Sequence, residues 1–73
     1  MDTLSALEKE IVILVAQGRR NREIAEKLCL AEQTIRNYLS EIYRKVGVNN
    51  RAGLTSYAWR VGWMDEDANI KSL

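Results

Sequence analysis

The spacing of apolar residues between positions 30 and 46 constrains the fold of this chain more than any other feature. Ile35, Leu39, Ile42 and Val46 recur every three or four residues, which places them on one stripe of an α-helix. The opposite side of that helix carries polar side chains rich in hydrogen-bond donors, namely Gln33, Arg36, Asn37, Ser40 and Arg44. Such a helix buries one face in a core. The other face either meets solvent or reads a partner, such as the base edges of a DNA major groove.

The composition of the whole chain favours helices. Its 73 residues allow one domain, proline is absent, and 47% of the residues are hydrophobic, which is typical of a small helical bundle. No apolar run approaches the roughly 20 residues that span a bilayer. The first ten residues also lack the basic and apolar segments of a secretion signal. We therefore expect no membrane contact and a cytoplasmic location.

Residue types that support catalysis or metal binding are scarce. The chain has one cysteine, Cys29, and no histidine, so neither a zinc site nor an internal disulfide can be assembled. No nucleophile stands beside a base, and no glycine-rich phosphate loop occurs. We expect no metal, no cofactor and no enzymatic activity. Because Cys29 stands between two leucines, it is expected to be a small buried hydrophobe.

Positive charge gathers in the middle of the sequence. The net charge is only +1, but residues 19 to 51 hold eight basic residues against four acidic ones, a local net charge of +4. The segments on either side are both negative. This distribution indicates one electropositive surface on a nearly neutral body, which is compatible with nucleic-acid binding.

Capping and turn residues divide the chain into four helices. Ser5 and Glu8 form a capping box at the start of the first helix, while Asn21 and Asn50 are the expected caps of the second and the fourth. Gly47 is expected to end the third helix in a left-handed conformation. The predicted fold class is all-α, a compact four-helix bundle containing a helix-turn-helix, with helices at about residues 5–17, 21–28, 32–46 and 51–61.

The helical period also predicts which side chains are buried. The expected core consists of Leu7, Ile11, Leu14, Val15, Ile24, Ala25, Leu28, Ile35, Leu39, Ile42, Val46, Leu54, Tyr57, Ala58 and Val61, with Leu39 at its centre. Val12, Ile13 and Trp59 fall outside the apolar stripes and are expected at the surface. Residues from about 64 to 73 are charged and aperiodic, so we expect a frayed tail there.

Four strings of residues resemble those of the LuxR-type, or NarL/FixJ-type, DNA-binding domains of bacterial transcription regulators. They are Leu4-Ser5 with Glu8-Lys9-Glu10-Ile11 and Gly18, then Asn21-Arg22-Glu23-Ile24-Ala25, then Thr34-Ile35-Arg36-Asn37-Tyr38-Leu39, and finally Arg44-Lys45-Val46-Gly47-Val48 with Asn50-Arg51. Because they lie in register over roughly residues 4 to 62, residues 1 to 73 are interpreted as a single domain of this type. The sequence departs from the family pattern at Ala6, Arg20, Ala31, Tyr38 and Gly53.

The resemblance implies sequence-specific binding of double-stranded DNA, with the third helix in the major groove. Carried over by position, the base-reading residues are Arg36, Asn37 and Ser40. Contacts with the DNA backbone are expected from Gln33, Thr34, Arg44, Lys45, Arg51 and Arg20. The fourth helix is implied to pair two copies on the DNA, and the candidate surface for this homodimer is Thr55, Ser56, Trp59 and Arg60.

Other expectations concern charge and partners. Glu41 lies beside the polar face of the third helix and would repel phosphates unless Arg44 or Lys45 pairs with it. In this family the domain is usually the output half of a longer chain with an N-terminal regulatory domain, and RNA polymerase is a further candidate partner. Two alternatives remain open. One is a sigma-type promoter-reading helix-turn-helix, and the other is a helix-turn-helix used only for protein interaction.

Overall fold

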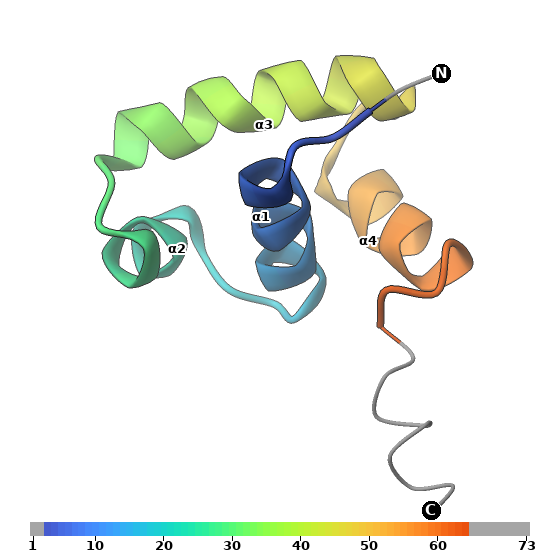
Figure 1. Ribbon diagram of the computed structural model, residues 1–73, viewed down its shortest axis with the longest axis horizontal. Helices are drawn as coiled ribbons and strands as arrows, with labels where there is room; N and C mark the ends of the chain where they lie inside the picture. Colours follow the sequence, from blue (N-terminus) through green and yellow to red (C-terminus); the bar gives the residue numbers. More distant parts are fainter. Residues whose placement is uncertain (1–2, 65–73) are drawn as a thin grey trace, which may run out of the picture.

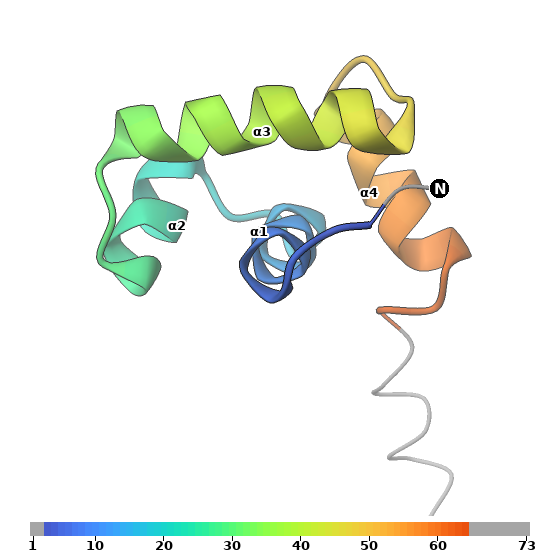
Figure 2. The ribbon, with the colours of Figure 1, turned by 45° about the horizontal axis from the view of Figure 1, so that its top comes forward.

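The computed structural model describes residues 3–64, which form four helices and connecting turns. The helices are α1 (Ala6–Ala16), α2 (Asn21–Leu28), α3 (Glu32–Val46) and α4 (Arg51–Arg60). α3 lies across one side of the molecule, and the other three helices lie beneath it in both views (Figures 1 and 2). The predicted all-α fold is confirmed, and each predicted helix bound is met within one residue.

Two of the helix starts and one helix end follow the predicted local chemistry. Ser5 Oγ accepts a hydrogen bond from the Glu8 amide at 3.1 Å, and Glu8 Oε1 accepts one from the Ser5 amide at 2.8 Å. Asn50 Oδ1 accepts the amide three residues further on at 2.8 Å. Gly47 ends α3 with φ +77°, a left-handed conformation that costs glycine little. These caps fix where α1 and α4 begin and where α3 stops.

The cap of α2 differs from the prediction, although the helix spans the predicted residues 21–28. Arg20 is the N-cap residue, and Asn21 is the first residue of the helix. Because a guanidinium has no acceptor, Arg20 cannot complete a capping box. Only the return bond is present, in which Glu23 Oε1 accepts the Arg20 amide at 2.8 Å. Ala31, before α3, provides no side-chain cap either.

One apolar core is shared by all four helices. Its buried members are Ile11, Val12, Leu14, Val15, Ile24, Ala25, Ile35, Leu39, Ile42, Leu54 and Ala58. α1 packs mainly against α4, and α2 packs mainly against α3. All of the core residues except Val12 are predicted from the helical period.

Several predictions about burial are wrong. Val12 is fully buried because α1 contacts all three other helices and is therefore covered on more than one side. Cys29 is exposed because it ends α2 in a left-handed conformation, with φ +58°. Val61 is exposed because α4 ends one residue before it. Trp63 and Met64 pack against the core, so the chain is still ordered at the start of the predicted tail. The rest of that tail lies outside the described residues.

The part of the chain that the structure describes offers no helix long and apolar enough to cross a membrane. Within residues 3–64, no three potential metal ligands of the His, Cys, Asp or Glu type come together.

Candidate nucleic-acid interface

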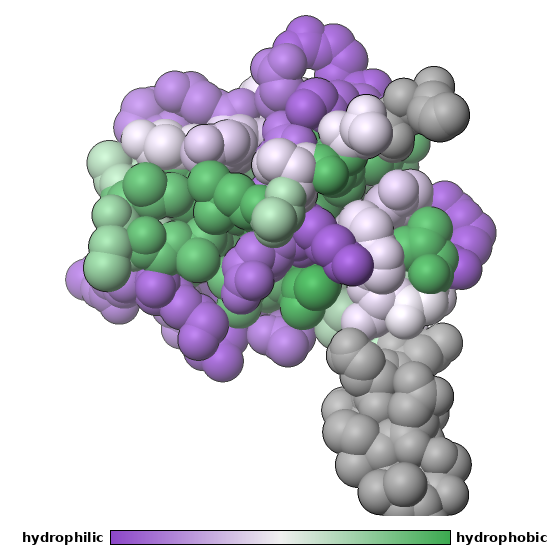
Figure 3. Space-filling view, in the orientation of Figure 1, coloured by the Kyte–Doolittle hydropathy of each residue, from purple (hydrophilic) through white to green (hydrophobic). Residues whose placement is uncertain are grey.

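α2 and α3 form a helix-turn-helix in which α3 presents its polar face outward. The turn follows Leu28, and the Leu30 amide closes it by donating to the Ala25 carbonyl at 2.9 Å. The outward side chains of α3 are all exposed, namely Gln33, Arg36, Asn37, Ser40 and Arg44. Hydrophilic residues accordingly gather along the outer side of α3 (Figure 3). The two predicted faces of this helix are therefore present, and we call the outward set the reading face.

The first half of the reading face is a chain of side-chain hydrogen bonds. Arg36 donates through one terminal nitrogen to Glu32 Oε2 at 3.0 Å and through the other to Gln33 Oε1 at 3.3 Å. Gln33 Nε2 in turn donates to Asn37 Oδ1 at 3.1 Å. The structure thus brings the predicted base-reading residues Arg36 and Asn37 together. Ser40 lies one turn further along, exposed on the same side.

The second half of α3 holds two further cations, and each is paired. Arg44 donates to Glu41 Oε1 at 2.9 Å, so the pairing required to neutralise Glu41 is present. Lys45 Nζ donates to both carboxylate oxygens of Glu8 in α1, at 3.0 and 2.9 Å. With the bond between Arg36 and Glu32, every cation of α3 has a carboxylate partner. The electrostatic attraction of α3 for phosphates is correspondingly small.

Glu8 joins the first turn of α1 to the end of α3. Among the charged residues that the structure describes, Glu8 is the buried one, with only 5% of its surface exposed. The pKa of its carboxyl is lowered, first by the hydrogen bond from the Ser5 amide and then by the hydrogen bond from Lys45, against the opposing effect of burial. One carboxylate therefore caps α1 and holds α3 in place.

Glu8→Gln is expected to destabilise the domain by about 1 to 2 kcal/mol at pH 7. The substitution removes the charged carboxylate that accepts hydrogen bonds from the Ser5 amide and from Lys45. Since folding lowers the pKa of Glu8, its stabilising effect is present above the unfolded-state pKa of about 4.5 and is lost as the pH falls through the folded-state value. The difference between the variant and the parent should therefore shrink in acid. Urea unfolding at pH 7 and at several values between pH 5 and 3 measures it.

The matched control is Glu10→Gln, an exposed position on the same helix, which should change stability little. An equal loss in both variants, or a difference that stays constant down to pH 3, would contradict this account of Glu8.

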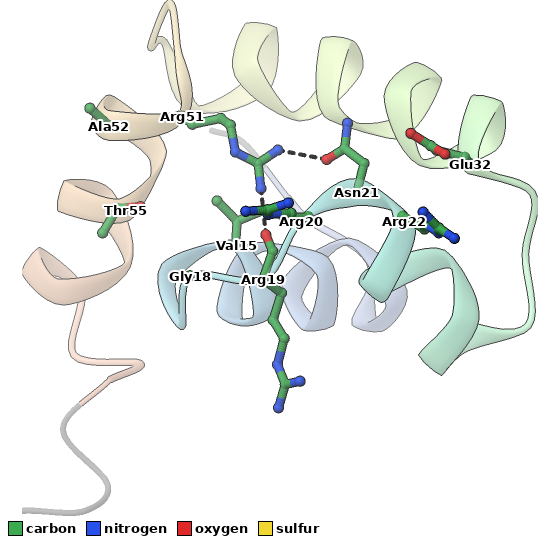
Figure 4. Close-up of a pocket in the computed structure, with 10 residues that line it drawn as sticks. All are labelled: Val15, Gly18, Arg19, Arg20, Asn21, Arg22, Glu32, Arg51, Ala52 and Thr55. Atoms are coloured by element: carbon green, nitrogen blue, oxygen red, sulfur yellow. Dashed lines mark hydrogen bonds between the residues drawn. The ribbon is translucent and has the colours of Figure 1, made fainter.

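A second basic region surrounds the start of α2. An open cleft of about 620 Å³ is lined by Val15, Gly18, Arg19, Arg20, Asn21, Arg22, Glu32, Arg51, Ala52 and Thr55 (Figure 4). We call it the arginine cleft. Arg19, Arg20 and Arg22 are exposed, and no ion pair joins them to another residue in the range 3–64. These three cations are therefore available to phosphates.

Arg51 is different, because its guanidinium is bonded to other residues of the same domain. From the first position of α4 it donates to Asn21 Oδ1 at 2.6 Å and to the Arg19 carbonyl at 2.7 Å. Figure 4 shows the side chain extending from α4 toward the start of α2. This fork ties α4 to the turn between α1 and α2.

The other predicted site residues have simpler surroundings. Thr34 is half-buried in the first turn of α3. On α4, Trp59 is 53% exposed, Ser56 and Arg60 are exposed, and Thr55 is half-buried.

Sequence reasoning did not single out Arg19, Arg22, Glu32 or Glu8 as site residues. The run of three arginines within residues 19–22 was the signal that could have identified the first two.

Comparison with known proteins agrees with this geometry. The sequence model of the family described as bacterial regulatory proteins, luxR family, matches residues 2–58. The chain is 53% identical over 49 residues to the probable HTH-type transcriptional regulator GfsR of Streptomyces halstedii, covering 67% of this chain and 20% of that protein. It is 40% identical over 60 residues to the transcriptional regulatory protein DesR of Bacillus subtilis (strain 168), covering 82% and 30%.

A solved structure shows the same fold. The crystal structure of the response regulator ChrA, of a heme-sensing two-component system, superimposes with a TM-score of 0.77 at 40% sequence identity. The match covers 82% of this chain and 30% of ChrA, so the chain spans about a fifth to a third of the length of these relatives. The chain belongs to the luxR family of bacterial regulatory proteins, and it is a helix-turn-helix DNA-binding domain of that family.

Proposed function

We propose that this domain binds double-stranded DNA in a sequence-specific manner, with α3 in the major groove, as the output domain of a bacterial transcription regulator. The observation that carries the proposal is the reading face of α3, which exposes Arg36, Asn37 and Ser40 while the opposite side is buried. An arginine can donate two bonds to guanine, and an asparagine can pair with adenine. The major groove is wide enough to admit a helix.

Contacts with phosphates are divided between two regions. Arg20 is the best supported of the predicted backbone contacts, because it lines the arginine cleft beside the start of α2, where unpaired amides favour an anion. The other predicted contacts are Gln33, Thr34, Arg44, Lys45 and Arg51. Of these, Lys45 and Arg51 contribute less, because internal bonds already hold the charged end of each side chain against its own domain. Arg19 and Arg22 join Arg20 as donors in this proposal.

Two copies of the domain bind together on one DNA site. A single module of this size buries only about 600 to 1,000 Å² on DNA, which limits its affinity. The outer face of α4 is the proposed homodimer surface, made of Thr55, Ser56, Trp59 and Arg60. Trp59 and, just beyond the helix, Val61 are the large hydrophobic residues most exposed in the described part of the chain. Exposed apolar area of this kind supports an interaction surface.

The wider setting of the domain is also a proposal. Relatives named as transcriptional regulators and the response regulator ChrA support action on transcription together with a regulatory domain. We add RNA polymerase as a further partner and expect no catalysis. Such a protein acts in the cytoplasm, where bacterial DNA lies. The match to the luxR family, and the presence of α4, favour this reading over the sigma-type alternative.

The proposal is tested by selecting bound duplexes from a random pool with the purified chain. We expect one enriched sequence that contains two copies of a half-site, bound about 1,000-fold more tightly than random duplex at physiological salt. Affinity for both should fall as salt rises, because phosphate contacts release counterions. A pool without enrichment would leave only the protein-interaction alternative.

The same selected duplex tests the dimer surface. Trp59→Ala should abolish cooperative binding to the full site while leaving affinity for a single half-site unchanged, and titrations of both duplexes measure this. Unchanged cooperativity on the full site would show that α4 is not the surface through which copies meet.

A further inference from the structure

Glu32 is an acidic residue that contacts a predicted base-reading side chain, and no predicted contact includes it. It is the first residue of α3 and lies at the end of the arginine cleft (Figure 4). Its carboxylate accepts from Arg36 at 3.0 Å, with 43% of the Glu32 side chain and 52% of the Arg36 side chain exposed. A glutamate four residues before an arginine is the favourable order for such a pair on a helix.

Arg36 is the cation of the first half of α3. Its ion-pair partner therefore affects whether its guanidinium contacts a phosphate or a base edge. An arginine without a partner is attracted to any phosphate, and phosphates are present on every sequence. A free Arg36 would therefore strengthen binding to random duplex, where it contacts phosphates, more than binding to the selected duplex, where it contacts a base. Glu32 competes with phosphates for the same guanidinium nitrogen, and its own negative charge repels them. The competition acts mainly against nonspecific binding, because Arg36 contacts a base in the specific complex, whereas the repulsion acts on every sequence.

The pairing leaves Arg36 able to read a base. A guanidinium has five N–H donors, and the bond to Glu32 uses one of them. Gln33, a neutral acceptor, holds the other terminal nitrogen by a longer bond of 3.3 Å, which a guanine edge can replace. A side chain already held at one end has fewer conformations to lose when it contacts a base. Glu32 thus lowers the cost of the specific contact.

We propose that Glu32 is a specificity-determining residue, which acts through Arg36 by withholding it from phosphates and orienting it toward a base edge. The inference rests on the proposed DNA-binding function and adds to it. A structural role is the competing explanation, because a carboxylate in the first turn stabilises a helix, and α3 has no side-chain cap at Ala31. That role changes thermal stability but not the preference for one sequence over another.

The experiment compares Glu32→Gln with Glu41→Gln. Both variants remove one negative charge from α3, and both glutamates pair with an arginine, at 3.0 Å and 2.9 Å. Dissociation constants are measured for the selected duplex and for random duplex at several salt concentrations. Glu32→Gln should raise affinity for random duplex by about threefold and lower the ratio of specific to nonspecific affinity by about threefold. Glu41→Gln should raise both affinities by a similar factor and leave the ratio unchanged.

A third variant shows whether the effect passes through Arg36. In an Arg36→Ala background, Glu32→Gln should no longer change the ratio. A fall in the ratio that persists in this background, or that is no larger than in Glu41→Gln, overturns the inference while the proposed function stands. A parent domain that shows no sequence preference overturns the proposed function, and the inference with it.

Discussion

Leu39→Ala is expected to lower the free energy of unfolding by about 2 to 5 kcal/mol, a large part of the 5 to 15 kcal/mol that a domain typically possesses. Leu39 is 4% exposed and belongs to the core cluster to which all four helices contribute. The substitution removes buried methyl groups and leaves a cavity that closely packed helices fill only in part. Urea or thermal unfolding followed by circular dichroism measures the loss.

Ser40→Ala is the matched control, because Ser40 follows Leu39 on the same helix and is exposed. Its effect on stability should stay within about 0.5 kcal/mol. If Leu39→Ala were no more destabilising than this control, the buried side of α3 would be assigned wrongly, and its reading face with it.

Arg36→Ala is expected to cost about 1 to 3 kcal/mol of binding free energy on the selected DNA sequence and to relax the preference at one base pair. The reason is that a bidentate contact with a base edge exists only on the correct sequence. Binding to random duplex should change little apart from the effect of one lost charge. The informative quantity is the ratio of specific to nonspecific affinity, measured at several salt concentrations.

Arg20→Ala serves as the contrasting variant, because Arg20 is exposed in the arginine cleft without an ion pair to another residue of the described part. This substitution should weaken binding to all DNA sequences by a similar factor. It should also reduce the slope of log affinity against log salt concentration by about 1. If both variants lost the same affinity on every DNA sequence, Arg36 would be identified as a phosphate contact. No loss in either variant would remove the DNA-binding proposal.

The features that could be predicted from the sequence depend on residues close together in the chain. The two faces of α3 follow from a period of three to four residues, and the starts of α1 and α4 follow from caps acting over three residues. The cap of α2 is one residue away from the predicted position, because Asn21 is a better capping type than Arg20. Capping propensity favours asparagine on local grounds. In the structure, however, the Asn21 side chain accepts a hydrogen bond from Arg51, which is far away in the sequence.

The features that sequence reasoning missed depend on residues far apart in the chain. Lys45 and Glu8 are 37 positions apart, and Arg51 and Asn21 are 30 apart, so no periodic pattern connects them. A basic residue engaged internally looks the same in a sequence as one that is free to bind phosphate. Val12 was misplaced for a related reason, because a helix covered by three neighbours buries more than one stripe. The roles of the predicted contact residues in DNA binding stay predictions.

The fork of Arg51 has a geometric consequence for any DNA site that two copies share. If α4 pairs the copies, the separation of their two α3 helices depends on the angle at which α4 is attached to the helix-turn-helix within each copy. Arg51 fixes that attachment through two bonds, at 2.6 and 2.7 Å, to the segment before and at the start of α2. A lysine has no planar fork with which to make both bonds. The number of base pairs between half-sites is therefore set partly by a guanidinium whose two bonds lie within a single copy.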